Sequence, residues 1–261
     1  MEIFADAFAL PKAGNAADEY EDACHPHKSV HNPRVEGFRC AVADGATESA
    51  FAGEWARLIA KAYCKGRIQA QIREKMLEPV RAKWRQCTQR SNLPWYAEQK
   101  LASGAFAALV GLTIHDGAHR RWDALAIGDC CVFQVRDSRC VAAFPLDSAE
   151  AFNNSPFLLC SHSMAPGALA SHLQRFQGTW EPGDVFYLMS DALAAWFLRA
   201  IGAAEQPWAA LNDFGTEGEL ENFEVFIAGL RRDALLKNDD VTLLRVACYD
   251  TSNRYELAHD G

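Results

Sequence analysis

The spacing of apolar positions changes along the chain and separates predicted strands from predicted helices. Apolar runs from Ile3 to Leu10 and from Phe38 to Ala43 predict two strands near the N-terminus. After Glu48 the apolar residues recur every three or four positions, as in an amphipathic helix. This helical pattern contains Phe51, Trp55, Leu58, Ile59 and Ala62, and continues beyond Gly66 with Ile68, Ile72, Met76 and Val80. The two stretches predict a helical hairpin.

The middle of the chain predicts a third helical piece and then an antiparallel meander. Helical spacing from Trp95 to Leu101 precedes four apolar runs that are separated by gaps of turn length. The four runs are Ala105 to Ile114, Trp122 to Ile127, Cys131 to Val135 and Cys140 to Phe144. Segments 153–156 and 166–167, rich in Asn, Ser, Pro and Gly, predict irregular structure, either a surface excursion or a loop over a substrate.

The last third of the chain returns to alternating strands and helices. Apolar runs predict strands from Val185 to Met189 and from Val241 to Cys248. Helical spacing predicts one helix from Leu193 to Ile201 and two more over about 206–211 and 220–236. Because no linker or change of composition interrupts the pattern, we expect one domain over residues 1–250, followed by a polar tail over 251–261.

Four aspartates occupy matching places in this pattern, each at the end or just before the start of an apolar run. They are Asp44, Asp129, Asp191 and Asp239. Strand ends meet at the edge of a sheet, so the pattern predicts that these carboxylates gather rather than scatter. Neighbouring carboxylates repel one another, and a hard divalent cation such as Mg²⁺ or Mn²⁺ relieves that repulsion. The sequence therefore predicts a metal site.

Composition narrows the function further. The 261 residues are 49% hydrophobic, which is enough for a large core, and the formal net charge of −8 argues against nucleic acid or an anionic membrane as the main partner. Neither a secretory signal nor a membrane-spanning run is visible in the sequence, so we expect a soluble cytoplasmic protein. The nine cysteines, an odd number, indicate reduced thiols.

Short motifs around the aspartates resemble those of the metal-dependent protein serine/threonine phosphatases of type 2C. Asp44-Gly45 is similar to the family's Asp-Gly-His-Gly, Ser103-Gly104-Ala105 to its Ser-Gly-Thr/Ser-Thr, Gly128-Asp129 to its Gly-Asp-Ser-Arg, Ser190-Asp191 to its Ser-Asp-Gly, and Asp239-Asp240-Val241-Thr242 to its Asp-Asn-x-Thr. The order and approximate spacing agree from residue 1 to about 248. Glu21-Asp22 falls where the family has a Glu-Asp pair, with Asp18-Glu19 as a competing register.

The resemblance implies an α+β fold, a four-layer αββα sandwich of two antiparallel sheets flanked by helix pairs. It also implies two Mn²⁺ or Mg²⁺ ions per chain. Asp44 would bridge them, Asp191 and Asp239 would complete one site, and the Gly45 carbonyl and Glu21 would serve the other, Glu21 directly or through water. Asp22 would orient a metal-bound water that attacks phosphorus. Asp129 with Asp191 is either the site of a third, weaker cation or a plain hairpin-turn aspartate.

The sequence also departs from the family's motifs. Ala46 stands where the motif histidine, a general acid, is expected, and Ala17 stands at the place of the phosphate-binding arginine. Lys12 is the nearest cation to Ala17, so it is a candidate for phosphate binding as a point charge, with a solvated loop lysine as the alternative. Asp240 replaces the motif asparagine and adds a carboxylate beside Asp239.

Other functions compete with this interpretation. Cys130 with Arg136 and Cys248 with Arg254 have the Cys-x₅-Arg spacing of tyrosine phosphatases, but the residues after Cys130 alternate like a strand and contain no glycine. The stronger alternative is a catalytically weak regulatory module that binds a phosphorylated or other protein partner. We expect a phosphoprotein or small phosphomonoester substrate and consider a cognate kinase as a partner.

Overall fold

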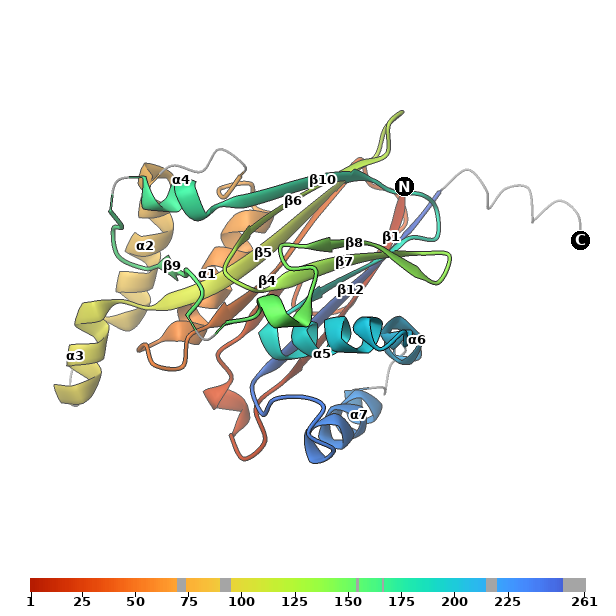
Figure 1. Cartoon of the computed structure of the whole chain (residues 1–261). Helices are drawn as coiled ribbons and strands as arrows, with labels where there is room; N and C mark the ends of the chain where they lie inside the picture. Colours follow the sequence, from red (N-terminus) through yellow and green to blue (C-terminus); the bar gives the residue numbers. More distant parts are fainter. Residues whose placement is uncertain (70–73, 90–94, 154, 166, 215–219, 251–261) are drawn as a thin grey trace, which may run out of the picture.

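The protein is a sandwich of two six-stranded sheets in which every strand pair is antiparallel (Figure 1). The computed structural model describes residues 1–69, 74–89, 95–153, 155–165, 167–214 and 220–250. The predicted tail over 251–261 lies outside the described residues. Among the described residues, no helix is long and apolar enough to cross a membrane.

The first sheet, sheet A, joins the two ends of the chain. In order across the sheet it contains β3 (Val30–Asn32), β1 (Glu2–Leu10), β12 (Val241–Tyr249), β11 (Val185–Met189), β7 (Cys131–Arg136) and β8 (Arg139–Phe144). Sheet B contains β10 (Gln174–Thr179), β6 (Arg121–Ile127), β5 (Phe106–His115), β4 (Gly37–Gly45) and β2 (Ala23–His25), while the short β9 (Leu159–Cys160) pairs with the start of β5.

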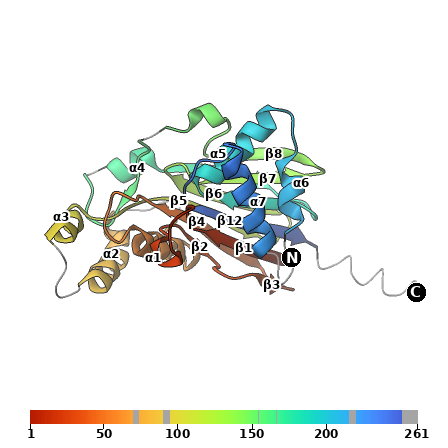
Figure 2. The ribbon, with the colours of Figure 1, turned by 90° about the horizontal axis from the view of Figure 1, so that it is seen from below.

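Helices cover the outer faces of both sheets (Figure 2). On the side of sheet B lie α1 (Ala52–Cys64), α2 (Glu74–Thr88), α3 (Trp95–Ser103) and the short α4 (Ala168–His172). On the side of sheet A lie α5 (Asp191–Gly202), α6 (Pro207–Asn212) and α7 (Leu220–Arg232). Two single 3₁₀ turns, η1 (Ala17–Glu19) and η2 (Ala149–Ala151), lie in connections. The predicted α+β fold with two antiparallel sheets between helices is confirmed.

Strand β4 illustrates how the sequence builds these layers. Cys40 and Val42 face the other sheet and belong to the core between the sheets, whereas Ala41 and Ala43 face α1 and belong to the core under the helices. Successive residues of a strand point to opposite faces, which explains this division. The two alanines are small, so α1 can approach the sheet closely.

The predicted four-strand meander is wrong, because its two hairpins lie in different sheets. β5 pairs with β6 in sheet B, whereas β7, the next strand along the chain, pairs with β8 and β11 in sheet A. The chain crosses between the sheets at Gly128, whose φ of +89° favours glycine and at which a Cβ would lie 2.6 Å from that of Ala108. Apolar alternation predicts strands but not which sheet each strand joins.

Four strands are not predicted by the sequence pattern. β2 and β3 are only three residues long each, β9 is two residues long, and β10 is a mostly exposed polar edge strand. His25, in a polar stretch beside Pro26, lies half-buried in β2. The last helix also ends earlier than predicted, at Arg232 rather than residue 236. Ile72, part of the predicted helical pattern, lies outside the described residues.

Candidate metal centre

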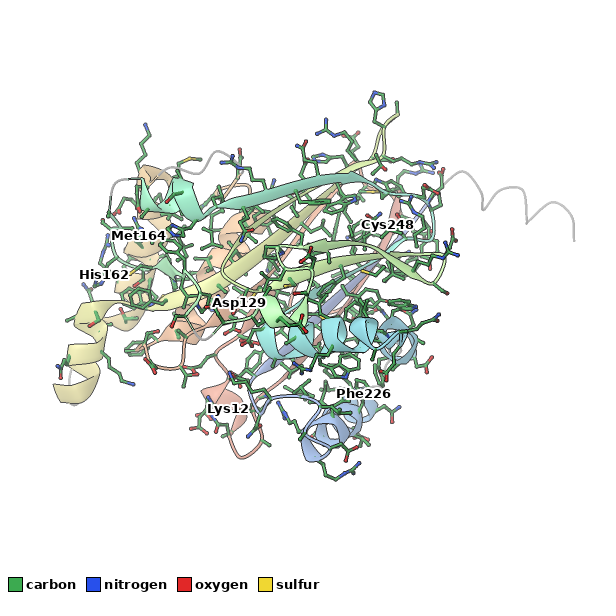
Figure 3. All side chains as sticks on the ribbon, viewed as in Figure 1. Lys12, Asp129, His162, Met164, Phe226 and Cys248 are labelled. Atoms are coloured by element: carbon green, nitrogen blue, oxygen red, sulfur yellow. The ribbon has the colours of Figure 1, made fainter. Side chains whose placement is uncertain are left out.

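The two sheets bring the four predicted aspartates to one end of the sandwich. Asp44 is the last residue but one of β4, and Asp129 lies at the crossing between β6 and β7. Asp191 is the first residue of α5, directly after β11, and Asp239 lies just before β12. Figure 3 labels Asp129 near the start of α5. Residues that are distant in sequence therefore meet because strands from both sheets end, or begin, at the same place.

The charges of these aspartates act on one another. Burial raises the pKa of Asp44 well above its usual range, and the carboxylates of Asp22, Asp191, Asp129 and Asp239 raise it further. Asp44 and Asp191 lie close enough to share a hydrogen bond, which partly offsets the burial and the Asp239 charge that raise the pKa of Asp191. Such mutual perturbation requires carboxylates that lie close together with few opposite charges.

Asp129 belongs to the same cluster. Burial, followed by the negative charge of Asp191, raises the pKa of Asp129 to about 6. Its side chain is half-buried at the crossing of the chain between the sheets. The structure thus brings Asp129 into electrostatic contact with Asp191, the pairing expected for a third cation. The alternative of a hairpin-turn aspartate is wrong, because β6 and β7 lie in different sheets.

Lys237 is a charged neighbour of this cluster that the sequence analysis missed. Its Nζ lies 2.6 Å from Oδ2 of Asp239. The same ammonium lowers the pKa of Asp191 and Asp129. The hydrogen bond to Asp239 in turn raises the pKa of Lys237, despite partial burial. Its position two residues before Asp239 was the only available signal in the sequence, because an exposed lysine before a strand is usually a solvated one.

Glu21 and Asp22 approach the cluster through the backbone. A Cβ on Gly45 would lie 2.6 Å from the Glu21 carbonyl oxygen and 2.8 Å from the carbonyl carbon of Ala52. Only glycine therefore allows the end of β4 to pack directly against the Glu21 segment and the start of α1. Burial raises the pKa of Glu21, with Thr47 and Lys12 lowering it. The Glu21-Asp22 register thus lies beside Asp44, whereas Asp18 and Glu19 are exposed in η1.

Asp22 is the most buried acid of the group, with 5% of its surface exposed. Thr242 Oγ1 donates a hydrogen bond of 2.7 Å to its Oδ2. Burial raises the pKa of Asp22 to about 7, although hydrogen bonds from Thr242 and Ser190 lower it. Ser190 Oγ also accepts the Thr242 backbone N–H at 3.0 Å. The two hydroxyl residues next to Asp191 and Val241 therefore hold Asp22 in one orientation.

Asp240, the residue in place of the motif asparagine, fastens two loops. Its Oδ1 accepts the backbone N–H of Lys12 at 2.8 Å, and its Oδ2 accepts that of Glu21 at 2.7 Å. With 6% of its surface exposed, Asp240 is buried by these loops. Both acceptor oxygens are used, so this carboxylate positions the segments that carry Lys12 and Glu21.

The candidate phosphate-binding residue Lys12 lies at the edge of the cluster (Figure 3). Its Nζ donates a hydrogen bond of 3.4 Å to Thr47 Oγ1, and its charge lowers the pKa of Glu21. Ala17 is exposed in η1, and Ala46 follows directly after β4 with its N–H donated to the Phe106 carbonyl at 2.9 Å. Neither alanine can donate a proton or bind phosphate through its side chain.

The donor chemistry of the cluster fits a hard divalent cation, since all of its side-chain ligands would be carboxylate oxygens. The side chains are not, however, gathered in a finished ligand set. Within the part of the chain that the structure describes, no group of three or more His, Cys, Asp or Glu residues has the geometry to hold a metal ion. The ion pair between Lys237 and Asp239 places an ammonium group against one of these carboxylates.

The structure does not support the alternative of a cysteine-dependent tyrosine phosphatase. Cys130 is buried, and burial with the nearby charges of Asp44 and Asp129 raises the pKa of its thiol well above the usual range. A nucleophilic thiol needs the opposite shift. Arg136 lies on β7, where it pairs with Asp184 at 2.7 Å. Arg254 lies outside the described residues.

Comparisons with known proteins agree with this fold. The photosystem II phosphatase PBCP has a TM-score of 0.55 at 14% identity, over 94% of this chain and 98% of that one. PppA of Pseudomonas aeruginosa, described as a regulatory component of T6SS, has a TM-score of 0.54 at 18% identity, over 95% and 98%. The catalytic domain of the phosphatase PstP, solved with 2 manganese ions, has a TM-score of 0.53 at 17% identity, over 96% and 100%.

At such identities the solved structures establish only the fold. No curated sequence matches the chain significantly. The sequence model for protein phosphatase 2C, in contrast, matches residues 18–227, which is most of the chain. The matched range includes Glu21, Asp44, Asp129 and Asp191. The chain therefore belongs to the protein phosphatase 2C family.

Proposed function

We propose that this protein is a metal-dependent phosphomonoester hydrolase that removes phosphate from phosphoserine or phosphothreonine in proteins. The observation that carries the proposal is the convergence of Asp44, Asp191 and Asp129 at one end of the sandwich, where burial and mutual repulsion raise their pKa values. A cluster of this kind is unfavourable unless a cation neutralises it. Membership of the protein phosphatase 2C family indicates the class of reaction, and the aspartate cluster indicates where on the protein the reaction would occur.

Two Mn²⁺ or Mg²⁺ ions would be held by the residues already described. Asp44 would bridge them, Asp191 and Asp239 would complete one site, and Glu21 with the Gly45 carbonyl would form the other. Asp129 would help to hold a third. When bound, the ions would lower the pKa of water and neutralise phosphoryl oxygens. The two manganese ions in the PstP structure support this number.

The residues around the centre would orient the reactants. Asp22, fixed by Thr242 at 2.7 Å, would accept a hydrogen bond from the attacking water and align it with phosphorus. Lys12 would attract the phosphoryl group as a single positive charge, since no arginine stands at the position of Ala17. Because Ala46 cannot donate a proton, the departing oxygen would take its proton from solvent. We therefore expect a slow enzyme that favours good leaving groups.

A second candidate function has its own observation in support. Lys237 pairs with Asp239, and among the described residues no ready group of three metal ligands is present. A protein in which an ammonium group replaces the cation would bind a phosphorylated partner without hydrolysing the phosphate. The two functions predict different responses to added metal.

The test is phosphate release from an aryl phosphate and from a phosphoserine peptide, measured with Mn²⁺, with Mg²⁺ and with excess chelator. We expect activity only with metal, and at least about a hundredfold loss of kcat in Asp44→Asn and Asp191→Asn, as for loss of a major catalytic group. Asp137→Asn is the matched control, because Asp137 is exposed in the β7–β8 turn at a φ of +48°, which asparagine accepts. Activity that survives chelation would exclude the metal mechanism, whereas inactivity together with binding of the phosphopeptide would establish the regulatory function.

A further inference from the structure

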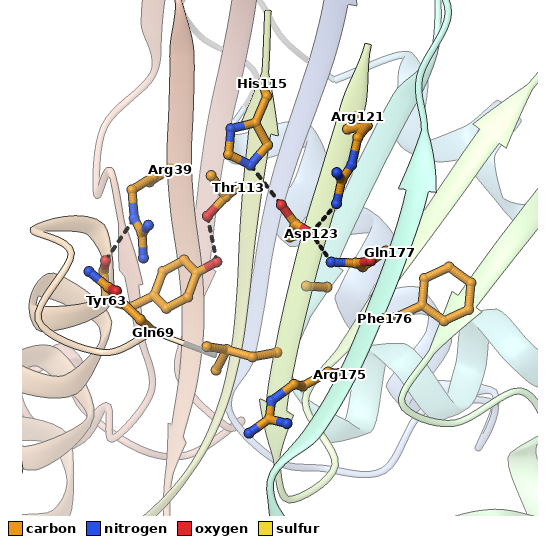
Figure 4. A pocket seen from close by; sticks show the side chains of 12 residues that line it. Arg39, Tyr63, Gln69, Thr113, His115, Arg121, Asp123, Arg175, Phe176 and Gln177 are labelled. Atoms are coloured by element: carbon orange, nitrogen blue, oxygen red, sulfur yellow. Dashed lines mark hydrogen bonds and ion pairs between the residues drawn. The ribbon is translucent and has the colours of Figure 1, made fainter. Parts of the chain in front are cut away.

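A second polar site lies on the outer face of sheet B, away from the carboxylate cluster (Figure 4). It is a cleft of about 800 Å³, which is within the usual range for small-molecule sites. Arg39, on its wall, precedes Asp44 by five residues of β4, which corresponds to roughly 17 Å of strand. The cleft is therefore separate from the candidate metal centre.

Strand register explains why polar side chains gather here. Arg39 of β4 is paired with Thr113 of β5, Thr113 with Asp123 of β6, and Asp123 with Gln177 of β10. These four residues form one row across four strands and share the outward face. In a neighbouring row, Arg175 of β10 pairs with Leu125. The cleft is thus built by the regular sheet and not by a loop.

Tyr63 of α1 forms one wall of the cleft. Its ring lies over Gly111 so closely that a Cβ there would come within 2.5 Å of ring atoms. Tyr63 and Thr113 share a hydrogen bond of 2.8 Å between their hydroxyl groups. The Arg39 guanidinium lies over the ring, 4.4 Å from its centroid. Gly111 and the hydroxyl pair therefore fix the surface on which Arg39 rests.

Positive charge dominates the cleft although the whole chain has a formal net charge of −8. Three guanidinium groups, those of Arg39, Arg121 and Arg175, line it together with a single carboxylate, Asp123. Asp123 is already occupied, because it accepts hydrogen bonds of 2.7 Å from both His115 and Gln177 and lies 3.6 Å from Arg121. The carboxylate therefore leaves two of the arginines uncompensated.

Arg39 and Arg175 have the properties of anion ligands. Arg39 donates to the carbonyl oxygens of Tyr63 at 3.0 Å and Ile68 at 3.1 Å, which hold it in place but leave its charge unpaired. Among the described residues, neither Arg39 nor Arg175 has a carboxylate partner. Figure 4 shows Arg39 on one side of the cleft and Arg175 on the other. Guanidinium groups suit the planar, two-point recognition of phosphate, and that of Arg39 is held in place by its two carbonyl acceptors.

We propose that this cleft binds a small ligand with two or more phosphate groups, anchored by Arg39 and Arg175. The spacing of these arginines across the sheet favours a ligand with several charges over a single phosphate. Tyr63 and Leu125 form the buried floor of the cleft beneath the ligand. This site is independent of the proposed hydrolase activity and offers a place for a regulatory molecule.

The experiment is isothermal titration calorimetry with pyrophosphate and with ADP, in buffer with chelator so that the candidate metal centre does not take up a metal–phosphate complex. We expect both probes to bind wild type, and Arg39→Met and Arg175→Met each to weaken binding at least about tenfold, as for loss of a charge-assisted contact. Arg175→Met is the decisive variant, since the Arg175 side chain has no hydrogen bond or ion pair within the described residues and its replacement should not disturb folding. Arg139→Met, at an exposed arginine of β8 in the other sheet, should bind like wild type.

Asp44→Asn distinguishes the cleft from the metal centre. Unchanged binding in that variant supports the proposal, and loss of binding would place the ligand at the centre and overturn it. Binding of neither probe would also overturn it, as would equal affinity in wild type and Arg175→Met. Arginine-dependent binding of a hexaglutamate peptide without binding of either probe would replace the proposed ligand with an acidic protein segment.

Discussion

At the scale of single residues, one carboxylate of the cluster is paired with an ammonium group. Lys237 contacts Asp239 at 2.6 Å and acts electrostatically on Asp191, Asp44 and Asp129. At the proposed metal centre, a divalent cation would have to compete with this charge for Asp239. Lys237 would therefore lower the apparent affinity of the centre for metal.

Removing that ammonium should tighten metal binding. We expect Lys237→Met to bind Mn²⁺ several-fold more tightly than wild type, because the ammonium group that pairs with Asp239 then no longer competes with the metal ion. Calorimetric titration of the chelator-stripped protein measures the change, and Lys75→Met, at an exposed position of α2, is the control. Unchanged or weaker Mn²⁺ binding in Lys237→Met would show that Lys237 does not compete with the metal.

A second residue-scale prediction concerns the side chain missing at Ala46. Without a general acid, kcat/KM should fall steeply as the leaving group becomes more basic, so wild type should hydrolyse an aryl phosphate far better than phosphoserine. Ala46→His should improve the phosphoserine substrate more than the aryl one. Kinetics on both substrates test this. Equal efficiency of wild type on the two would mean that another group supplies the proton.

At the scale of elements, the centre depends on how closely β4, α1 and the Glu21 segment pack. Gly45 lies where these three meet, and its missing side chain leaves the contact distances described above. Ala41 and Ala43 extend the same close packing along the strand under α1. The geometry of Glu21 relative to Asp44 therefore depends on small residues that carry no chemistry.

Gly45→Ala should push the end of β4 away from α1 and the Glu21 segment. The added Cβ would meet backbone atoms at 2.6 Å and 2.8 Å, which cannot rotate away, so we expect a loss of about 1–3 kcal/mol in the free energy of unfolding. Gly37→Ala is the control at the other end of β4, because there the nearest atom is 3.5 Å away. Urea denaturation compares the two variants. Equal stability of Gly45→Ala and Gly37→Ala would contradict this account of the packing.

At the scale of the whole molecule, the cluster links stability to pH and to metal. The pKa values of Asp22 and Asp129 are raised to about 7 and about 6 in the folded protein, above the value of roughly 4 for an unfolded aspartate. Between these values the folded state binds more protons than the unfolded state. The metal-free protein therefore loses stability as pH rises from about 4 to 7.

Chelator-treated protein should accordingly melt at a lower temperature at pH 7.5 than at pH 5.5, and Mn²⁺ should raise the melting temperature more at pH 7.5. Asp129→Asn should flatten the pH dependence, because it removes one of the groups with a raised pKa. Comparing the variant with wild type isolates this effect from that of His25, whose burial lowers its pKa and acts in the opposite direction. The linkage would be refuted if wild type with chelator were more stable at pH 7.5 than at pH 5.5, and if Asp129→Asn showed the same difference in stability between the two pH values.

Sequence pattern alone predicts most of the longer elements, because apolar period is a local property of the chain. β1, β4, β11 and β12, and the helices α1 and α5, follow from the spacing of their apolar residues. The short strands β2 and β3 and the polar edge strand β10 have too little apolar signal to be predicted. The division of the predicted meander between two sheets also lies beyond local pattern, since it depends on which distant strand each hairpin meets.

The candidate metal centre, like the fold, could be predicted only in part from the sequence. The sequence by itself determined that Asp44, Asp129, Asp191 and Asp239 stand at the ends of apolar runs, and motif order determined the family. Only the tertiary structure decided that Lys237 neutralises Asp239, that Asp240 fastens the Lys12 and Glu21 loops, and that Arg39 and Arg175 face one cleft. The reason is physical. The local sequence determines that a residue lies at the end of a strand, but its electrostatic neighbours come from segments as much as 228 residues away and are determined by packing and sheet register.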